Sequence, residues 1–175
     1  NKAVTLDLNG YTINGGWIFV GVDGDAKNFT SSKLKIVGSG SFITTGLLRM
    51  SHKAMLDLSE WTGGTISKVS PYQNGSEEST LISGENKGTI NSLVFYSWPS
   101  NSINNTKLTG GTYGYIPITM NYPVNSIAFS DLLADGYAFQ YVDSGEFVDY
   151  AAKAEYENGG GSISNVKVVK CTAHV

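Results

Sequence analysis

Acidic side chains in similar sequence surroundings are the first candidates for chemistry. Asp7, Lys35 and Asp57 each lie between two aliphatic residues in otherwise similar segments. If these segments stack as neighbouring strands, Asp7 and Asp57 lie roughly 9–10 Å apart with Lys35 between them. This separation is near the upper limit for an inverting glycoside hydrolase, but the lysine would keep both acids ionised when one must carry a proton. We therefore expect a surface ion-pair ladder, worth about 0–1 kcal/mol per pair.

Side chains that could bind a metal or act as nucleophiles are sparse. The segment Asp23–Asp25 with Asn28 could offer oxygen ligands to calcium, although two acids around a glycine are typical of an ordinary surface turn. The two histidines, His52 and His174, have no companion serine in a nucleophile-elbow motif. Cys171 and His174 supply only two of the four ligands of a structural zinc site. We expect no cofactor and no catalytic triad.

An acid-free segment that is rich in aromatic and amide side chains is a candidate for binding. Residues 86–130 contain no Asp or Glu, and only Lys87 and Lys107 are charged. Aromatic rings stack on the C–H faces of sugars while amides bond hydroxyl groups, and Tyr and Trp are equally suited to protein contacts. The alternative is that several rings fill the interior and the asparagines stack at corners. The side chains expected at the contact surface are Trp98, Tyr96, Tyr113, Tyr115 and Tyr122.

The composition describes one all-β domain. The 175 residues are 41% hydrophobic, enough for a sizeable core, and 21 Gly with many Ser, Thr and Asn favour strands and turns over helices. A net charge of −3 with a single arginine gives no basic face for phosphates, so nucleic acid is not an expected partner. No stretch approaches the ~20 apolar residues of a membrane span. One cysteine excludes an internal disulfide. Because the first residues read as a strand and not as a signal peptide, we expect a piece of a longer protein.

A repeat organises the chain. Glycine-flanked segments with β-branched or aromatic residues recur, and their last residues are separated by 30, 23, 24 and 23 positions. Each unit carries two or three short strands and has no room for a helix. These segments are Tyr11–Ile13, Ser41–Ile43, Gly64–Ile66, Gly88–Ile90 and Gly111–Tyr113.

Two architectures accommodate many short strands with turns between them. An antiparallel sandwich predicts strands every 8–12 residues without a longer period. A parallel solenoid stacks one coil on the next, so that equivalent residues form columns. The period of 23–24 residues favours the solenoid. We therefore expect a right-handed parallel β-helix of five or six coils over residues 1–130, with inward columns of Leu, Ile, Val and Phe.

Residues 131–175 depart from the coil spacing and are expected to close the same domain. Residues 136–142 alternate apolar with small or polar side chains, turn at 143–145 and continue at 146–148, which predicts a β-hairpin. A rival interpretation makes Asp143 and Glu146 the capping box of a short helix through Tyr156. Residues 162–169 alternate as a final strand. Either version covers the last coil, whose open strand edge would otherwise template aggregation.

The segment Val4–Ile13 resembles the first coil of right-handed parallel β-helix domains, the pectate-lyase-like fold, which occur in large surface proteins of Gram-positive bacteria. The segments Asp131–Phe139 and Val166–His174 resemble the closing region of such domains. The resemblance implies an extracellular piece of a cell-wall-attached protein, joined to neighbouring domains. Lyases of this fold use a basic side chain beside acid-bound calcium, and Arg49 has no adjacent acidic cluster.

These observations favour a non-catalytic role. We expect a surface adhesion or binding module, of the kind that serves virulence, which recognises a host glycan or an extracellular-matrix protein. The alternative is a polysaccharide hydrolase or lyase on the same scaffold, with Asp7, Asp57 and Glu60 as the acids concerned. A third interpretation is a purely structural spacer, since β-helices serve all of these functions.

Overall fold

The computed structural model describes residues 2–21, 32–50, 53–71, 73–74, 77–97, 106–120, 129–149 and 160–171. Within these ranges every regular element is a β-strand, apart from one short 3-10 helix, η1 (Phe129–Leu132). The strands are β1 (Lys2–Asp7), β2 (Thr12–Gly15), β3 (Ile18–Val20), β4 (Ser32–Ser39), β5 (Ser41–Thr44), β6 (Leu48–Met50), β7 (Met55–Gly63), β8 (Thr65–Ile66), β9 (Val69–Pro71), β10 (Gln73–Asn74), β11 (Glu77–Glu78), β12 (Thr80–Ile82), β13 (Thr89–Ser92), β14 (Phe95–Ser97), β15 (Thr112–Met120), β16 (Tyr137–Tyr141) and β17 (Gly160–Lys170).

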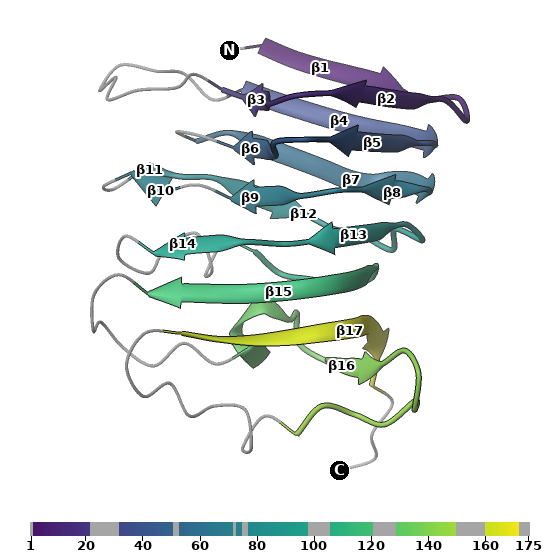
Figure 1. Ribbon diagram of the computed structural model, residues 1–175, viewed down its shortest axis with the longest axis vertical. Coiled ribbons are helices and arrows are strands. Elements are labelled where there is room, and N and C mark those ends of the chain that lie inside the picture. Colours follow the sequence, from purple (N-terminus) through teal and green to yellow (C-terminus); the bar gives the residue numbers. More distant parts are fainter. Residues whose placement is uncertain are drawn as a thin grey trace.

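Three strands joined by turns make one coil of the molecule. The chain runs along β1, turns into β2 and β3, and returns to place β4 beside β1 (Figure 1). Figure 1 shows the chain passing along the more distant β1, β4 and β7 in one direction and back along the nearer β2 and β3 while it descends, which is a right-handed path. The predicted fold class, a right-handed parallel β-solenoid, is confirmed.

Equivalent strands of successive coils pair in parallel and form three faces. The first face is β1-β4-β7-β12, the second is β2-β5-β8-β13-β15, and the third is β3-β6-β9. The three faces together make about three turns, fewer than the five or six coils expected. The repeat overestimates the number because its segments all mark the second face, which continues regularly to β15, whereas the third face ends in a single bridge between Val69 and Leu93.

The second face carries the clearest column of inward side chains. Ile13 pairs with Phe42, and the column continues through Ile66, Ile90 and Tyr113. The four members after Ile13 are at most 2% exposed. Burying a large apolar side chain contributes about 1.5–3 kcal/mol, so this column is a main source of stability. The expected equivalence of Ile13 with Ile43 is wrong by one residue, because Phe42 is the inward neighbour and Ile43 points outward.

The buried side chain of Trp61 connects the coil that precedes it with the coil that follows it. Trp61 is 1% exposed, and its Nε1 donates a hydrogen bond of 3.0 Å to the carbonyl oxygen of Gly40. The ring lies against Gly88 in the following coil, where an added Cβ would stand 2.2 Å from Trp61 Cη2. Only glycine leaves room for this ring, so the repeated glycine before the strand has a packing role.

The closing segment reverses the strand direction. β17 pairs antiparallel with β15, placing Val166 beside Tyr113 and Ser164 beside Tyr115, and β16 pairs antiparallel with β17. Residues 146–148 bond back to β16, since the Val148 amide donates to the carbonyl oxygen of Phe139 at 3.0 Å. The predicted hairpin and final strand are therefore confirmed. The rival helix is wrong for residues 146–149, and its remainder lies outside the described residues.

Replacing Gly88 by alanine tests the packing of Trp61. The added methyl group overlaps the indole ring, so Gly88→Ala should lower the free energy of unfolding by about 1–3 kcal/mol in denaturant titrations. Gly15→Ala is the matched control, because nothing lies within 4 Å of the position that its Cβ would take. Equal stabilities for the two variants would contradict this account of the glycine.

Candidate functional site

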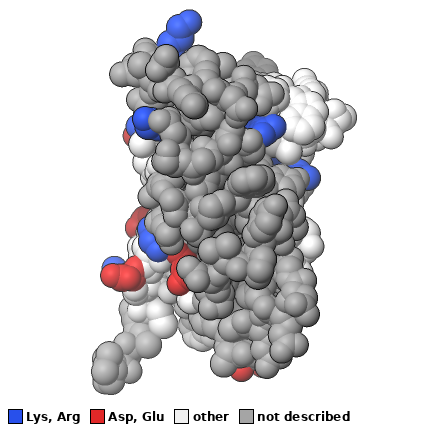
Figure 2. All heavy atoms as spheres, turned by 90° about the vertical axis from the view of Figure 1, so that its left-hand side faces the viewer, with Lys and Arg blue, Asp and Glu red and all other residues white. Residues whose placement is uncertain are grey.

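Charged side chains of both signs lie close together on the described part of the surface. Figure 2 looks onto the side at the left of Figure 1, where lysine or arginine atoms and acidic atoms occur side by side near the margin of the view. Two ion pairs between described residues join β4 to β7 on the first face: Lys33 with Asp57 and Lys35 with Glu60.

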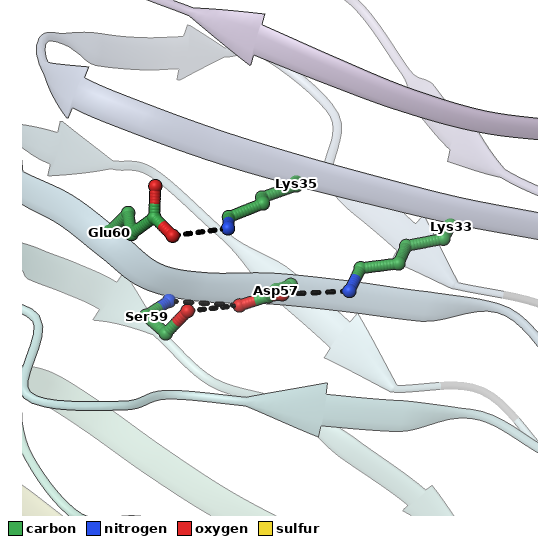
Figure 3. A network of polar contacts seen from close by, with 5 residues as sticks. All are labelled: Lys33, Lys35, Asp57, Ser59 and Glu60. Carbon is green, nitrogen blue, oxygen red and sulfur yellow. Dashed lines mark hydrogen bonds and ion pairs between the residues drawn. The ribbon is translucent and has the colours of Figure 1, made fainter.

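Asp57 is the most constrained acid of this network. Its carboxylate accepts hydrogen bonds from the Ser59 amide at 3.1 Å and the Ser59 hydroxyl at 2.6 Å, and pairs with Lys33 Nζ at 2.9 Å (Figure 3). The side chain is only 8% exposed. Burial opposes ionisation, but the bonds from Ser59 and Lys33 outweigh it, so the pKa of Asp57 is lowered below its usual value. Asp57 is therefore ionised at neutral pH.

The second pair lies nearer to solvent. The Lys35 ammonium group donates a hydrogen bond to Glu60, whose side chain is 62% exposed (Figure 3). This hydrogen bond raises the pKa of Lys35; partial desolvation acts the other way, and the nearby charges of Glu60 and Asp57 add to the rise. Lys35 is therefore charged at neutral pH.

The expected column of Asp7, Lys35 and Asp57 is wrong in one member. Lys35 and Asp57 are neighbours in register, but Thr5 occupies the place beside Lys35, and Asp7 lies beside Val37. A shift of two residues keeps every side chain on its original face, so the alternation of apolar residues could not reveal it. Asp7 instead accepts a hydrogen bond of 2.9 Å from the Asn9 amide in the following turn.

This arrangement bears on the enzyme alternative. A glycoside hydrolase needs one protonated and one ionised carboxyl group. Asp57 is held as a carboxylate by three donors from two residues, and Glu60 is held beside an ammonium group. Asp57 is therefore not set up as the proton donor of such a pair.

Neutralising Asp57 should reduce stability in a pH-dependent way. A carboxyl group with a lowered pKa stabilises the fold above its unfolded-state pKa, and this contribution disappears as the pH falls through the folded-state value. Asp57→Asn should therefore cost about 1–3 kcal/mol at pH 7, and the difference from the unmodified protein should begin to shrink as the pH falls below the usual carboxyl pKa of 3.8 and be lost below the lowered folded-state pKa. Unfolding in denaturant across pH 2–7 measures this, with exposed Glu60→Gln as a control expected to cost about 0.5 kcal/mol or less.

Tyr113 was expected at the contact surface, but the structure places it in the core. It is 0% exposed, its hydroxyl donates to the carbonyl oxygen of Gly110 at 2.9 Å, and its ring meets Phe139 edge-on with centroids 6.5 Å apart. Burial raises the pKa of its hydroxyl well above the usual value, although side-chain hydrogen bonds with Ser83 and Asn86 act in the opposite direction. Tyr113 cannot reach an external ligand, and the alternative of rings filling the interior holds for this residue.

The hydrogen bond of Tyr113 can be tested by removing one atom. Tyr113→Phe leaves the buried Gly110 carbonyl without its donor and should cost about 1–3 kcal/mol of unfolding free energy. Tyr115→Phe removes the same atom from a side chain that is 44% exposed and should change stability by about 0.5 kcal/mol or less. A cost of similar size in both variants would refute the assignment of Tyr113 to the core.

Tyr115 is the expected contact residue that the structure exposes. It lies on β15 beside Ser92 of β13 and Ser164 of β17, so strands on both sides fix its backbone. The exposed amide side chains Asn91 and Asn165 are next to these serines in sequence. These five residues are called the Tyr115 surface. An aromatic ring among hydroxyls and amides suits a sugar or a polar protein surface.

Other expected residues cannot be placed on this surface. Trp98 and Tyr122 lie outside the described residues, and the side chain of Tyr96 does too, although its backbone belongs to β14. The calcium candidates Asp23, Asp25 and Asn28 are also outside, with both histidines, His52 and His174. Cys171 is a free, partly buried thiol. Within the described ranges no group of three or more His, Cys, Asp or Glu side chains is placed to hold a metal ion.

Two sets of exposed side chains were not expected from the sequence. Ser164 and Asn165 reach the Tyr115 surface because β17 turns back antiparallel, and no short-range pattern predicts which strand it pairs with. Trp17 and Phe19 are exposed aromatic residues of the first coil. The sequence does contain a signal for them, since two aromatic residues two positions apart lie at the start of a strand.

Comparison of the chain with protein-family models, curated proteins and solved structures finds no significant match. In the part of the chain that the structure describes, no helix is long and apolar enough to cross a membrane. The fold and the geometry of its surfaces are therefore the basis for a functional proposal.

Proposed function

We propose that the chain is a non-catalytic binding module that contacts a glycan or an extracellular-matrix protein through the Tyr115 surface. In this proposal the module belongs to an adhesin at the surface of a Gram-positive bacterium, where neighbouring domains anchor it to the cell wall. The resemblance of Val4–Ile13 to the first coil of such domains, together with the solenoid fold, supports this origin.

The exposure of Tyr115 on a rigid strand carries the proposal. A ring that is 44% exposed on the flank of a paired strand costs little to immobilise on binding, because its backbone is already fixed. Tyr115 also lies in a stretch of sequence, residues 86–130, without acidic residues, whereas Asn165 of the same surface donates a hydrogen bond to the carboxylate of Asp143, so the surface fits a neutral polar partner. The lysine-paired acids of the first face support a role without catalysis.

Replacing Tyr115 by alanine tests the surface directly. Glycan arrays and immobilised matrix proteins identify a ligand, and Tyr115→Ala should then weaken binding about tenfold or more, which corresponds to about 1.4 kcal/mol. Tyr11→Ala removes a ring that is 71% exposed elsewhere and should leave binding unchanged.

Two results would overturn the proposal. Unchanged affinity in Tyr115→Ala would remove this surface as the contact site. Release of products from neutral or uronate polysaccharides that stops in Asp57→Asn would establish the enzyme alternative instead.

A further inference from the structure

The first coil carries an exposed pair of aromatic rings on its outer side. Trp17 is 57% exposed and Phe19 is 41% exposed. Their ring centroids are 5.9 Å apart and their planes are nearly parallel, at 12°. Two adjacent, nearly parallel aromatic rings that face solvent present a preformed apolar surface to a ligand.

Trp17 is held in place by the backbone of the next coil. An added Cβ on Gly46 would stand 2.7 Å from Trp17 Cδ1, so the indole ring lies directly on this glycine. The Ile18 amide donates to the carbonyl oxygen of Leu47 at 3.1 Å, which fixes the strand that follows the ring. The position of the indole is therefore set by the protein and does not depend on a ligand.

Phe19 faces outward and does not belong to the core. Its neighbours Ile18 and Val20 point inward, and Val20 is 5% exposed. In the strand register Phe19 lies beside Arg49 of β6. The pair thus stands on the flank of the solenoid, away from the hydrophobic columns.

We propose that Trp17 and Phe19 form a site for neutral β-linked pyranose chains whose hydroxyl groups are equatorial. Such sugars have axial C–H bonds on both ring faces, which fit the electron-rich faces of aromatic rings. Asn14 and Thr45 are exposed and able to bond hydroxyl groups, and they lie near Trp17 and Gly46 in sequence. The Thr45 amide donates to the carbonyl oxygen of Gly15 at 3.0 Å, which joins the two segments. The inference rests on the proposed binding function and places a glycan on a different surface from Tyr115.

The size of the exposed rings favours a sugar over a protein. A large aromatic side chain buries 150–250 Å² when fully covered, so the exposed parts of Trp17 and Phe19 offer on the order of 200 Å². A stable protein interface needs about 800 Å² on each partner. The turn residues around the rings, such as Asn14, Gly16 and Thr45, are exposed and mostly polar, so they do not extend the apolar area.

Tryptophan fluorescence during titration with hexasaccharides tests the site. Cellohexaose and chitohexaose should shift the emission of Trp17, whereas β-1,4-linked mannohexaose, with an axial hydroxyl on every ring, should bind at least tenfold more weakly. Of the two other tryptophans, Trp61 is buried, and the titration is carried out in a Trp98→Phe background so that the signal comes from Trp17. Trp17→Ala should abolish the shift, and calorimetry should show at least tenfold weaker binding for Trp17→Ala and Phe19→Ala.

Three further variants separate stacking of the sugar on the rings from nonspecific effects of removing an exposed aromatic side chain. Gly46→Ala keeps both rings but pushes the indole out of place, so it should weaken binding at least threefold. Trp17→Phe retains a ring and should recover part of the affinity. Tyr11→Ala, a more exposed ring in the same coil, should bind like the unmodified protein.

Binding of cellohexaose or chitohexaose that is equally strong in Trp17→Ala would overturn the inference, as would absence of binding to both sugars in the unmodified protein. If Tyr115→Ala abolishes binding while Trp17→Ala retains it, the inference fails and the proposed function stands. If a matrix protein binds through Tyr115 and neither sugar binds, the inference alone fails.

Discussion

Parallel pairing between equivalent strands of successive coils is the constraint on which the rest of the structure depends. Each coil gives its backbone donors and acceptors to the coils on either side, so no strand is stable alone. The same pairing places Phe42, Ile66 and Ile90 one above another in the interior. Backbone bonding and apolar burial are therefore satisfied by one geometric relation, and any residue that disturbs the spacing between coils disturbs both.

The same relation decides where polar groups are placed. On the first face it brings Lys35 beside Asp57 and sets Lys33 within reach of the same carboxylate. On the second face it sets Ser92 beside Tyr115, whose other neighbour, Ser164, comes from the antiparallel β17. Trp17 rests on a glycine of the following coil for the same reason. A residue therefore acquires its surroundings mainly from positions about 23–30 residues away and less from its sequence neighbours.

Much of this architecture could be predicted from sequence, because the repeat of glycine-flanked segments records the coil directly. The register on the first face could not be predicted, since shifting Asp7 by two residues leaves the alternation unchanged. The sequence also does not show that Tyr113 is buried and Tyr115 exposed, because two strand residues separated by two positions are expected on the same side. The alternation of buried and exposed side chains breaks between them within β15, and Ile116 takes the next buried position, so Tyr113 is enclosed while Tyr115 is not. Trp17 could have been noticed, but its support by Gly46 is a contact between coils.

Strand reversal at β17 makes the two ends of the solenoid chemically different. At one end β17, β16 and residues 146–148 bond to each other in opposite directions, and η1 buries Phe129 and Leu132. At the other end, β1, β2 and β3 each pair with only one described strand, and Val4 is 55% exposed. A further parallel coil at the β15 end would therefore meet antiparallel strands in place of a matching parallel edge, so the closing segment works against edge-to-edge growth on that side.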